Sequence, residues 1–102
     1  MRIWIDILTP KQALFFAPLA HYLTEKGHEV ILTTREYPEA EAVLRMLELD
    51  AQTVGRHGGE TLVGKLEASA ERVLKLAAYV VEKAPDAAVC FASPECARVA
   101  LG

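Results

Sequence analysis

Two kinds of apolar segment alternate along this chain. Short runs rich in β-branched and aromatic residues are typical of buried strands, whereas longer runs with apolar residues every three or four positions are typical of helices. Strands that lack polar alternation and are joined by helices are typical of a parallel sheet covered on both faces. The predicted strands cover Arg2 to Leu8, His28 to Thr34, Ala51 to Gly55 and Ala87 to Ala92.

Capping residues mark the ends of the predicted helices between these strands. Thr9-Pro10 and Ser93-Pro94 each combine a hydroxyl N-cap with a proline at the first helical position, and Tyr37-Pro38 opens a further helix. Gly27 is a C-cap for the first helix, and Pro18 predicts a kink or a restart within it. The sequence therefore predicts one helix after each strand.

The helix predicted from Thr61 to Lys83 has the clearest periodicity. An amphipathic helix of this kind packs its apolar side on the core. The apolar positions are Leu62, Val63, Leu66, Ala70, Val73, Leu74, Ala77, Val80 and Val81, while Glu67, Glu71, Arg72 and Lys75 lie elsewhere.

The alternation of strand and helix also predicts the topology. Right-handed crossovers between four parallel strands give a Rossmann-like α/β sheet in the order 3-2-1-4, with helices on both faces. The 102 residues are enough for one such domain. In this fold ligands bind at the carboxyl ends of the strands, so the loops after the strands are where functional residues are expected.

Composition narrows the classes of function. A formal net charge of −3 disfavours a nucleic-acid or anionic-membrane surface, which needs a basic excess. The spacing of Cys90 and Cys96 is not that of a zinc or redox motif, so we expect both to be buried, reduced thiols. We expect neither a metal nor a cofactor. We find no apolar run long enough for a membrane span and no signal peptide, which favours a cytoplasmic protein.

The loop after the third strand, "GRHGGE", is the strongest candidate for a binding site. Glycines allow backbone N–H groups to turn toward a ligand, and the helix start that follows favours an anion. Arg56 suits a phosphate, and His57 can exchange a proton with a sugar hydroxyl. The alternative is a tight turn in which Gly58 and Gly59 only satisfy the geometry, with both side chains solvated.

Other polar residues are expected at the same edge of the sheet. Ser93 and Thr9 are explained by helix capping alone. Lys11 and Gln12 lie in a first helical turn, where a cation is unfavourable unless an anionic partner binds. Arg35 is either a ligand of the edge site or a surface residue, and Glu95 suits the first turn of its helix.

The chain also resembles a known family. The segments "MRIWIDILTPKQALFF", "GHEVILTTREY", "VGRHGG" and "PDAAVCFASPECARVALG" closely resemble the start of the DUF354 family, which is uncharacterised and mainly archaeal. That family is similar to GT-B glycosyltransferases and to UDP-N-acetylglucosamine 2-epimerases. Its members are about three times longer, as two Rossmann-like domains facing a cleft require.

The resemblance to the epimerases is partial. Ala17 to Leu23 matches their Ala-Pro-Leu segment, and Pro85-Asp86 matches the pair before their fourth strand. Thr9 stands where those enzymes carry an arginine, and Ser93 where they carry an aspartate. The resemblance therefore implies the fold but not the epimerase reaction.

The resemblance to GT-B enzymes implies an N-terminal, acceptor-side domain over residues 1–102, because the second domain of those enzymes binds most of the sugar nucleotide. It implies that His57 or Glu95 is the acid/base candidate, and that the chain is inactive alone. The residues implied to line the cleft are Lys11, Gln12, Arg56, His57, Gly58, Gly59, Ser93 and Glu95.

A stand-alone, non-catalytic binding module with the same half-fold is the alternative function. We also expect self-association, because the fourth strand is a sheet edge without charge or proline. A homodimer or higher oligomer would form through that edge or through the helices beside it. The residues expected to be exposed there are Val89, Cys90, Phe91, Val99 and Leu101.

Overall fold

Strands and helices alternate from one end of the protein to the other. The computed structural model describes residues 1–91 and 93–102. The strands are β1 (Arg2–Asp6), β2 (Glu29–Glu36), β3 (Ala51–Arg56) and β4 (Ala87–Cys90). The helices are α1 (Pro10–Glu25), α2 (Pro38–Met46), α3 (Leu62–Lys83) and α4 (Pro94–Leu101). The predicted α/β fold class is confirmed.

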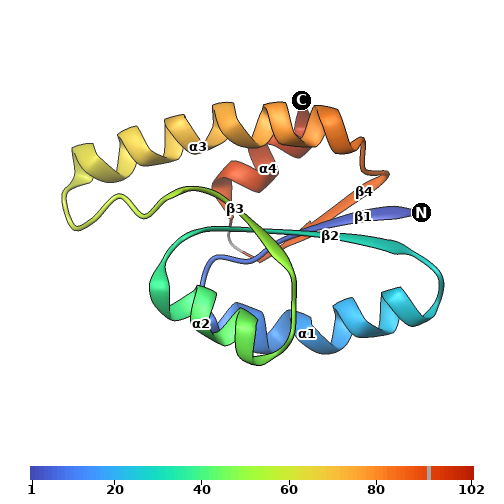
Figure 1. The fold of residues 1–102 in the computed structure, drawn as a ribbon. Coiled ribbons are helices and arrows are strands. Elements are labelled where there is room, and N and C mark those ends of the chain that lie inside the picture. The colour runs from blue at the N-terminus through green and yellow to red at the C-terminus, as the bar shows by residue number, and fades with distance from the viewer. Residues whose placement is uncertain (92) are drawn as a thin grey trace.

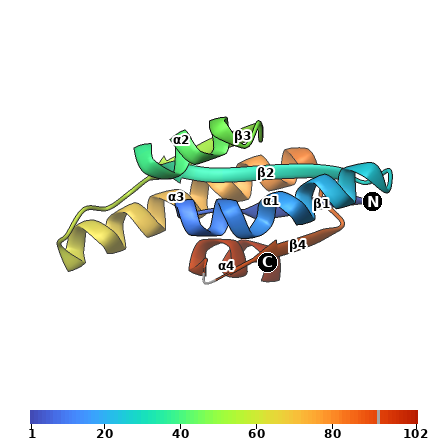
Figure 2. The same cartoon turned by 90° about the horizontal axis from the view of Figure 1, so that it is seen from below.

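The four strands form one parallel sheet in the order β3-β2-β1-β4, as predicted. Helices α1 and α2 cover one face of the sheet, and α3 and α4 cover the other, so the protein has three layers (Figure 1). The view from below shows α1 running roughly along β2 (Figure 2). This Rossmann-like arrangement brings the loops after all four strands to one edge.

Some boundaries differ from the prediction. β1 ends at Asp6 and not at Leu8, and β4 ends at Cys90, while Ala92 lies outside the described residues. α1 continues through Pro18 without a restart. Pro18 and Leu14, the residue whose carbonyl group loses its helical partner, are both on the exposed side of α1, where the cost of a proline is lower.

The core is divided by the sheet into two apolar clusters. The larger cluster lies on the side of α1 and α2 and is built around Ile3, Ile5 and Phe16. The smaller one lies on the side of α3 and α4 and contains Trp4, Val54, Leu76 and Cys96. None of the helices in the described parts of the chain is long and apolar enough to cross a membrane.

Helix α3 presents a different face to the sheet from the one that its periodicity predicts. Leu62, Leu66 and Leu74 are 82%, 69% and 75% exposed, whereas Arg72 is only 1% exposed. The expectation that the apolar side of α3 packs on the core is therefore wrong for most of its length. Arg72 faces inward because a buried carboxylate on β1 requires a cation, and Leu76 one turn later shares that inward face.

Both cysteines are free thiols. Cys96 is buried as expected, whereas Cys90 is only half-buried. Burial, and then the neighbouring Cys90 thiol, raise the pKa of the Cys96 thiol far above its ordinary value. Since the thiolate is the reactive form, Cys96 has little nucleophilic character in the folded protein.

We expect iodoacetamide at about pH 8 to leave Cys96 unmodified in the folded protein and to alkylate it after unfolding in urea. Mass spectrometry of proteolytic peptides measures the modification of each cysteine separately. Alkylation of Cys96 at the same rate in the folded and unfolded states would contradict this description of its surroundings.

Candidate functional site

A buried carboxylate organises the carboxyl edge of the sheet. Asp6, the last residue of β1, is fully buried. Its Oδ1 accepts a hydrogen bond from Thr33 Oγ1 at 2.8 Å, and its Oδ2 accepts one from Ser93 Oγ at 2.5 Å. Thr33 Oγ1 in turn accepts from Trp4 Nε1 at 2.8 Å. Strands β1 and β2 and the start of α4 therefore meet at one charge.

Arg72 of α3 neutralises that charge. Its Nη1 and Nη2 donate to the two Asp6 oxygens at 2.9 and 2.6 Å, which is bidentate pairing, and its Nε donates to the Val54 carbonyl at 2.8 Å. Burial alone would lower the pKa of the Arg72 guanidinium, but its bond to Asp6 and the charges of Asp6 and Glu95 raise that pKa above its ordinary value. Arg72 thus remains a cation inside the protein.

Gly55 makes room for the Arg72 side chain. Its φ is +79°, and a Cβ at this position would lie 2.7 Å from Arg72 Cγ. The register of β3 against β2 shifts at the same place, between Thr34 and Glu36. A glycine is required here because the arginine lies directly against the strand backbone and the φ is left-handed.

Glu95 connects this network to the surface. It is 5% exposed, its Oε1 lies 3.4 Å from Arg72 Nη1, and its Oε2 accepts a hydrogen bond from Ser69 Oγ at 3.1 Å. The carboxylate also lines a hollow at the carboxyl edge of the sheet. α3 and the network therefore hold one acidic group in a fixed position at the base of this hollow.

We define the edge pocket as that hollow, which has a volume of about 370 Å³. It lies between the ends of β2 and β3 and the starts of α3 and α4, and it brings together residues that are far apart in the sequence. Its lining residues are Arg35, Arg56, His57, Gly58, Lys65, Ala68, Ser69, Pro94 and Glu95.

Three cations and an imidazole surround the single carboxylate of the edge pocket. Arg56 lies 3.4 Å from Glu71, an exposed pair in which both partners are more than 40% exposed. Within the described ranges neither Arg35 nor Lys65 forms an ion pair, and the buried Nε atom of Arg35 has no hydrogen-bond partner. The pocket therefore has an excess of positive charge and an unused buried donor, which suits an anionic ligand.

His57 is held by its neighbours on both sides. Its ring stacks on Tyr37 with centroids 5.2 Å apart, and its Nδ1 accepts a hydrogen bond from the backbone N–H of Gly59 at 3.2 Å. That bond leaves Nε2 as the nitrogen that can donate to a ligand. The stacking and the bond fix the direction of the imidazole beside the pocket.

The loop that carries His57 is in tight contact with the start of α3. A Cβ at Gly58 would lie 2.6 Å from Lys65 Cα and 2.7 Å from the Gly64 carbonyl oxygen. Thr61 caps the helix through a hydrogen bond from the Gly64 backbone N–H at 3.0 Å. Since the close contacts of a Cβ at Gly58 are all with backbone atoms, this glycine sets the position of the loop relative to Lys65.

The predicted edge residues do not all gather at this pocket. Arg35, Arg56, His57, Gly58 and Glu95 line it, whereas Gly59 lies outside its lining. Ser93 also lies outside the lining, buried in the Asp6 network and capping α4 through the Cys96 backbone N–H.

Lys11 and Gln12 lie at a second, mainly apolar depression with Thr9, Phe15 and Phe91. Gln12 makes structural bonds there: its Oε1 accepts from the Leu8 backbone N–H at 2.9 Å, and its Nε2 donates to the Phe91 carbonyl at 2.9 Å. Lys11 is exposed at the margin of this depression. The edge of the sheet therefore carries one cationic pocket and one apolar depression.

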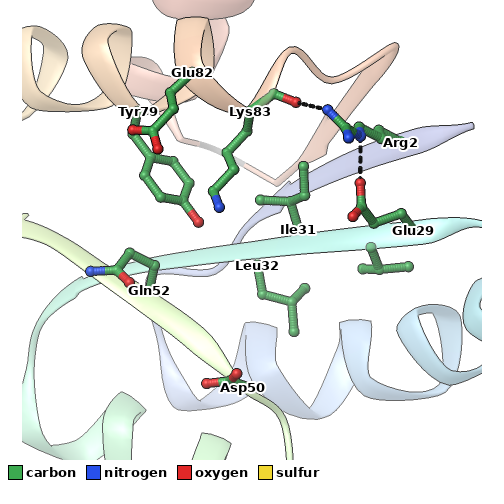
Figure 3. Close-up of a pocket in the computed structure, with 10 residues that line it drawn as sticks. Arg2, Glu29, Ile31, Leu32, Asp50, Gln52, Tyr79, Glu82 and Lys83 are labelled. Carbon is green, nitrogen blue, oxygen red and sulfur yellow. Dashed lines mark hydrogen bonds and ion pairs between the residues drawn. The ribbon is translucent and has the colours of Figure 1, made fainter.

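A larger hollow of about 490 Å³ lies at the opposite end of the sheet (Figure 3). Arg2 and Glu29 form an ion pair there, whereas Asp50 and Glu82 form none with the residues that the structure describes. Arg2 Nε lies 2.5 Å from Glu29 Oε2, Arg2 Nη1 donates to the Lys83 carbonyl at 2.7 Å, and the Lys83 ammonium lies over the Tyr79 ring. This hollow lies at the amino ends of β1 and β2, whereas ligands of this fold bind at the carboxyl ends of the strands, so the edge pocket is the stronger candidate.

Sequence reasoning missed several members of the site, among them Asp6, Arg72 and Lys65. The sequence did contain a signal for Asp6, because a carboxylate at the end of an apolar strand requires a buried partner. Arg72 and Lys65 carried no such signal, since each occupies an ordinary polar position of a helix.

Comparisons with known proteins identify relatives and structural neighbours. Residues 1–102 match the model of the family described as "Protein of unknown function (DUF354)". An uncharacterised protein of Methanocaldococcus jannaschii, MJ0665, is 30% identical over 102 residues, which cover 100% of this chain and 30% of that protein. The chain thus spans about a third of the length of this relative.

Among solved structures, the glycosyltransferase VinC in complex with dTDP superposes with a TM-score of 0.65 at 22% identity, over 88% of this chain and 29% of VinC. The spinosyn forosaminyltransferase SpnP superposes with a TM-score of 0.67 at 23% identity, over 88% and 25% of the two chains. A protein of Listeria monocytogenes described as a UDP-N-acetylglucosamine 2-epimerase gives a TM-score of 0.71 at 15% identity, over 97% and 26%. These similarities concern the fold and cover part of each neighbour.

Proposed function

The chain belongs to the DUF354 family, and we propose that it is the acceptor-side half of a GT-B-like glycosyltransferase or a related sugar-nucleotide enzyme. In this proposal the edge pocket binds an anionic acceptor, such as a sugar phosphate. The fold similarity to part of VinC and SpnP supports the placement in this class of enzyme. The chemistry of the pocket supports the kind of ligand.

The observation that carries the proposal is the charge of the edge pocket. Arg35, Arg56 and Lys65 face a single carboxylate, and that carboxylate is already paired with Arg72. Arg35 and Lys65, which form no ion pair with the described residues, would bind a phosphate together with Arg56, whose exposed pair with Glu71 leaves it accessible, and the guanidinium groups could pair with it bidentately. The N-terminus of α3 adds a partial positive charge on the same side.

His57 and Glu95 are the candidate groups for the sugar hydroxyls of the acceptor. His57 Nε2 would donate to a hydroxyl, and Glu95 would accept a proton from one. Glu95 is positioned for such a role because Arg72 and Ser69 hold its two oxygens. Catalysis would additionally require the nucleotide-binding domain of a longer protein.

We expect Arg56→Ala and Lys65→Met each to weaken the binding of pyrophosphate and N-acetylglucosamine 1-phosphate by about tenfold or more, because each removes one charge-assisted contact. Both variants should keep their free energy of unfolding within about 0.5 kcal/mol of the parent protein, since the side chains are exposed. NMR titration measures affinity, and the shifted amide signals should come from the loop at residues 56–60 and from the start of α3.

Lys26→Met is the matched control, because Lys26 is an exposed lysine that follows the last turn of α1, outside the edge pocket. It should leave both affinities unchanged. The proposal would be contradicted if neither ligand shifts the signals of Arg56, His57 and Lys65, or if the control weakens binding as much as Lys65→Met does.

A further inference from the structure

One carboxylate lies among hydrogen-bond donors in the edge pocket. The three cations of the lining are donors, and so is His57 Nε2, because the other ring nitrogen already accepts from Gly59. Glu95 is the one acidic side chain among the residues that line the pocket. A ligand that satisfies all of these groups therefore needs an anionic group for the donors and an O–H or N–H group for Glu95.

The buried network does not cancel the charge of Glu95. Arg72 is the cation of that network, and its shorter bonds, at 2.9 and 2.6 Å, go to Asp6. Glu95 Oε1 lies farther away, 3.4 Å from Arg72 Nη1. Two carboxylates thus share one guanidinium group, so the three side chains together carry a net negative charge. Glu95 is the member of the three that lines the pocket.

Ser69 holds the Glu95 carboxylate in one direction. Its Oγ donates to Glu95 Oε2 at 3.1 Å, and Ser69 itself lines the pocket. Arg72 restrains the other oxygen, so both contacts come from α3. Each carboxylate oxygen still has a lone pair for a ligand. Because Glu95 is buried and is held at both oxygens, it cannot turn away when an anion enters the pocket.

The cations of the pocket are not paired with this carboxylate. Among the described residues, none of Arg35, Arg56 and Lys65 forms an ion pair with Glu95. A phosphate bound to these cations would share the pocket with a like charge, and in a partly enclosed site such repulsion is screened less than in water. A hydroxyl group of the ligand that donates to Glu95 replaces this repulsion with a charge-assisted hydrogen bond.

We propose that Glu95 is the specificity-determining residue of the edge pocket, and that it selects phosphates that carry hydroxyl groups over phosphates that carry none. Ser69 is a positioning residue that acts through Glu95. This inference rests on the proposed function, since it takes the pocket to bind a phosphate, and it narrows the ligand to a phosphorylated polyol such as a sugar phosphate. Specificity then comes both from attraction to the correct ligand and from repulsion of a bare oxyanion.

The test compares two monophosphates of equal charge. N-acetylglucosamine 1-phosphate carries hydroxyl groups, and methyl phosphate carries none. NMR titration measures both dissociation constants, and their ratio is the preference of the protein. We expect Glu95→Gln to lower the preference for N-acetylglucosamine 1-phosphate at least about tenfold, because the variant loses the charge-assisted bond and the repulsion together. Methyl phosphate itself should bind more tightly to Glu95→Gln than to the parent protein.

Two variants of Ser69 test the positioning role while the carboxylate keeps its charge. Ser69→Ala should lower the same preference about threefold, since it removes one hydrogen bond that orients Glu95. Ser69→Thr keeps a hydroxyl group and should retain the parental preference. Glu67→Gln is the matched control, because it makes the same change of charge at an exposed position of α3 outside the pocket lining. It should leave the preference unchanged.

The outcomes separate this inference from the proposed function. If neither phosphate shifts the signals of the edge pocket, the proposed function is wrong, and this inference with it. If both phosphates bind and Glu95→Gln keeps the parental preference, this inference alone is wrong. Circular dichroism checks that each variant is folded. Should Glu95→Gln fail to fold, the two Ser69 variants decide, because equal preferences in Ser69→Ala and Ser69→Thr would overturn the inference.

Discussion

Arg72→Met is expected to lower the free energy of unfolding by about 3–5 kcal/mol, the cost of leaving one partner of a buried ion pair uncompensated. Methionine keeps the aliphatic part of the side chain but lacks the guanidinium group, so the loss also includes the bond to the Val54 carbonyl group. The Asp6 carboxylate would keep its bonds to Thr33 and Ser93 but would lose both bonds to the guanidinium. Urea unfolding followed by the fluorescence of Trp4, the single tryptophan, measures the change.

Lys75→Met is the matched control, because it removes a cation from the exposed side of the same helix. Its effect should stay within about 1 kcal/mol. In the double variant Asp6→Asn/Arg72→Met, the loss should be clearly smaller than the sum of the two single losses, since no buried charge remains without its partner. A loss below about 1 kcal/mol for Arg72→Met would show that Asp6 is not the buried anion described here.

The pH dependence of this effect follows from the raised pKa of Arg72. A cation with a raised pKa in the folded state stabilises the protein at every pH below its unfolded pKa. That contribution is lost only as the pH rises through the folded pKa, which for an arginine is far above neutrality. The Arg72 charge should therefore contribute equally to stability between about pH 6 and 9.

Ser93→Ala is expected to lower the free energy of unfolding by about 2–4 kcal/mol, because the hydroxyl group has two roles. It caps α4 by accepting from the Cys96 backbone N–H at 3.2 Å, which contributes about 1 kcal/mol. It also donates to the buried Asp6 carboxylate, a bond to a charged group that contributes about 1.5–3 kcal/mol. Thermal or urea unfolding measures the sum.

Thr9→Ala separates the two contributions. Thr9 precedes Pro10 and caps α1 by accepting from the Gln12 backbone N–H at 3.2 Å, and no hydrogen bond joins its side chain to a buried carboxylate among the residues that the structure covers. Thr9→Ala should therefore lower the free energy of unfolding only by the contribution of the helix cap, about 1 kcal/mol. Equal losses for Thr9→Ala and Ser93→Ala would mean that the bond from Ser93 to Asp6 adds nothing to stability.

The order of strands and the caps could be predicted from the sequence because both depend on local chemistry. Proline after a hydroxyl residue determines where α1 and α4 begin, and apolar runs of strand length determine where β1 and β4 lie. The order 3-2-1-4 then follows from right-handed crossovers. Arg35, Arg56, His57 and Glu95 could be assigned to one edge of the sheet for the same topological reason.

Only the tertiary structure decided which side of α3 faces the sheet. It also decided that the candidate residues at the carboxyl edge divide between two separate hollows. Periodicity shows that apolar residues share a side of α3, but not whether that side meets the core or another surface. Asp6 favours the observed orientation, since without Arg72 its charge would be left buried and uncompensated, at a cost of about 3–5 kcal/mol. Pairing between residues 66 positions apart depends on distance in space, and no local pattern in the sequence records it.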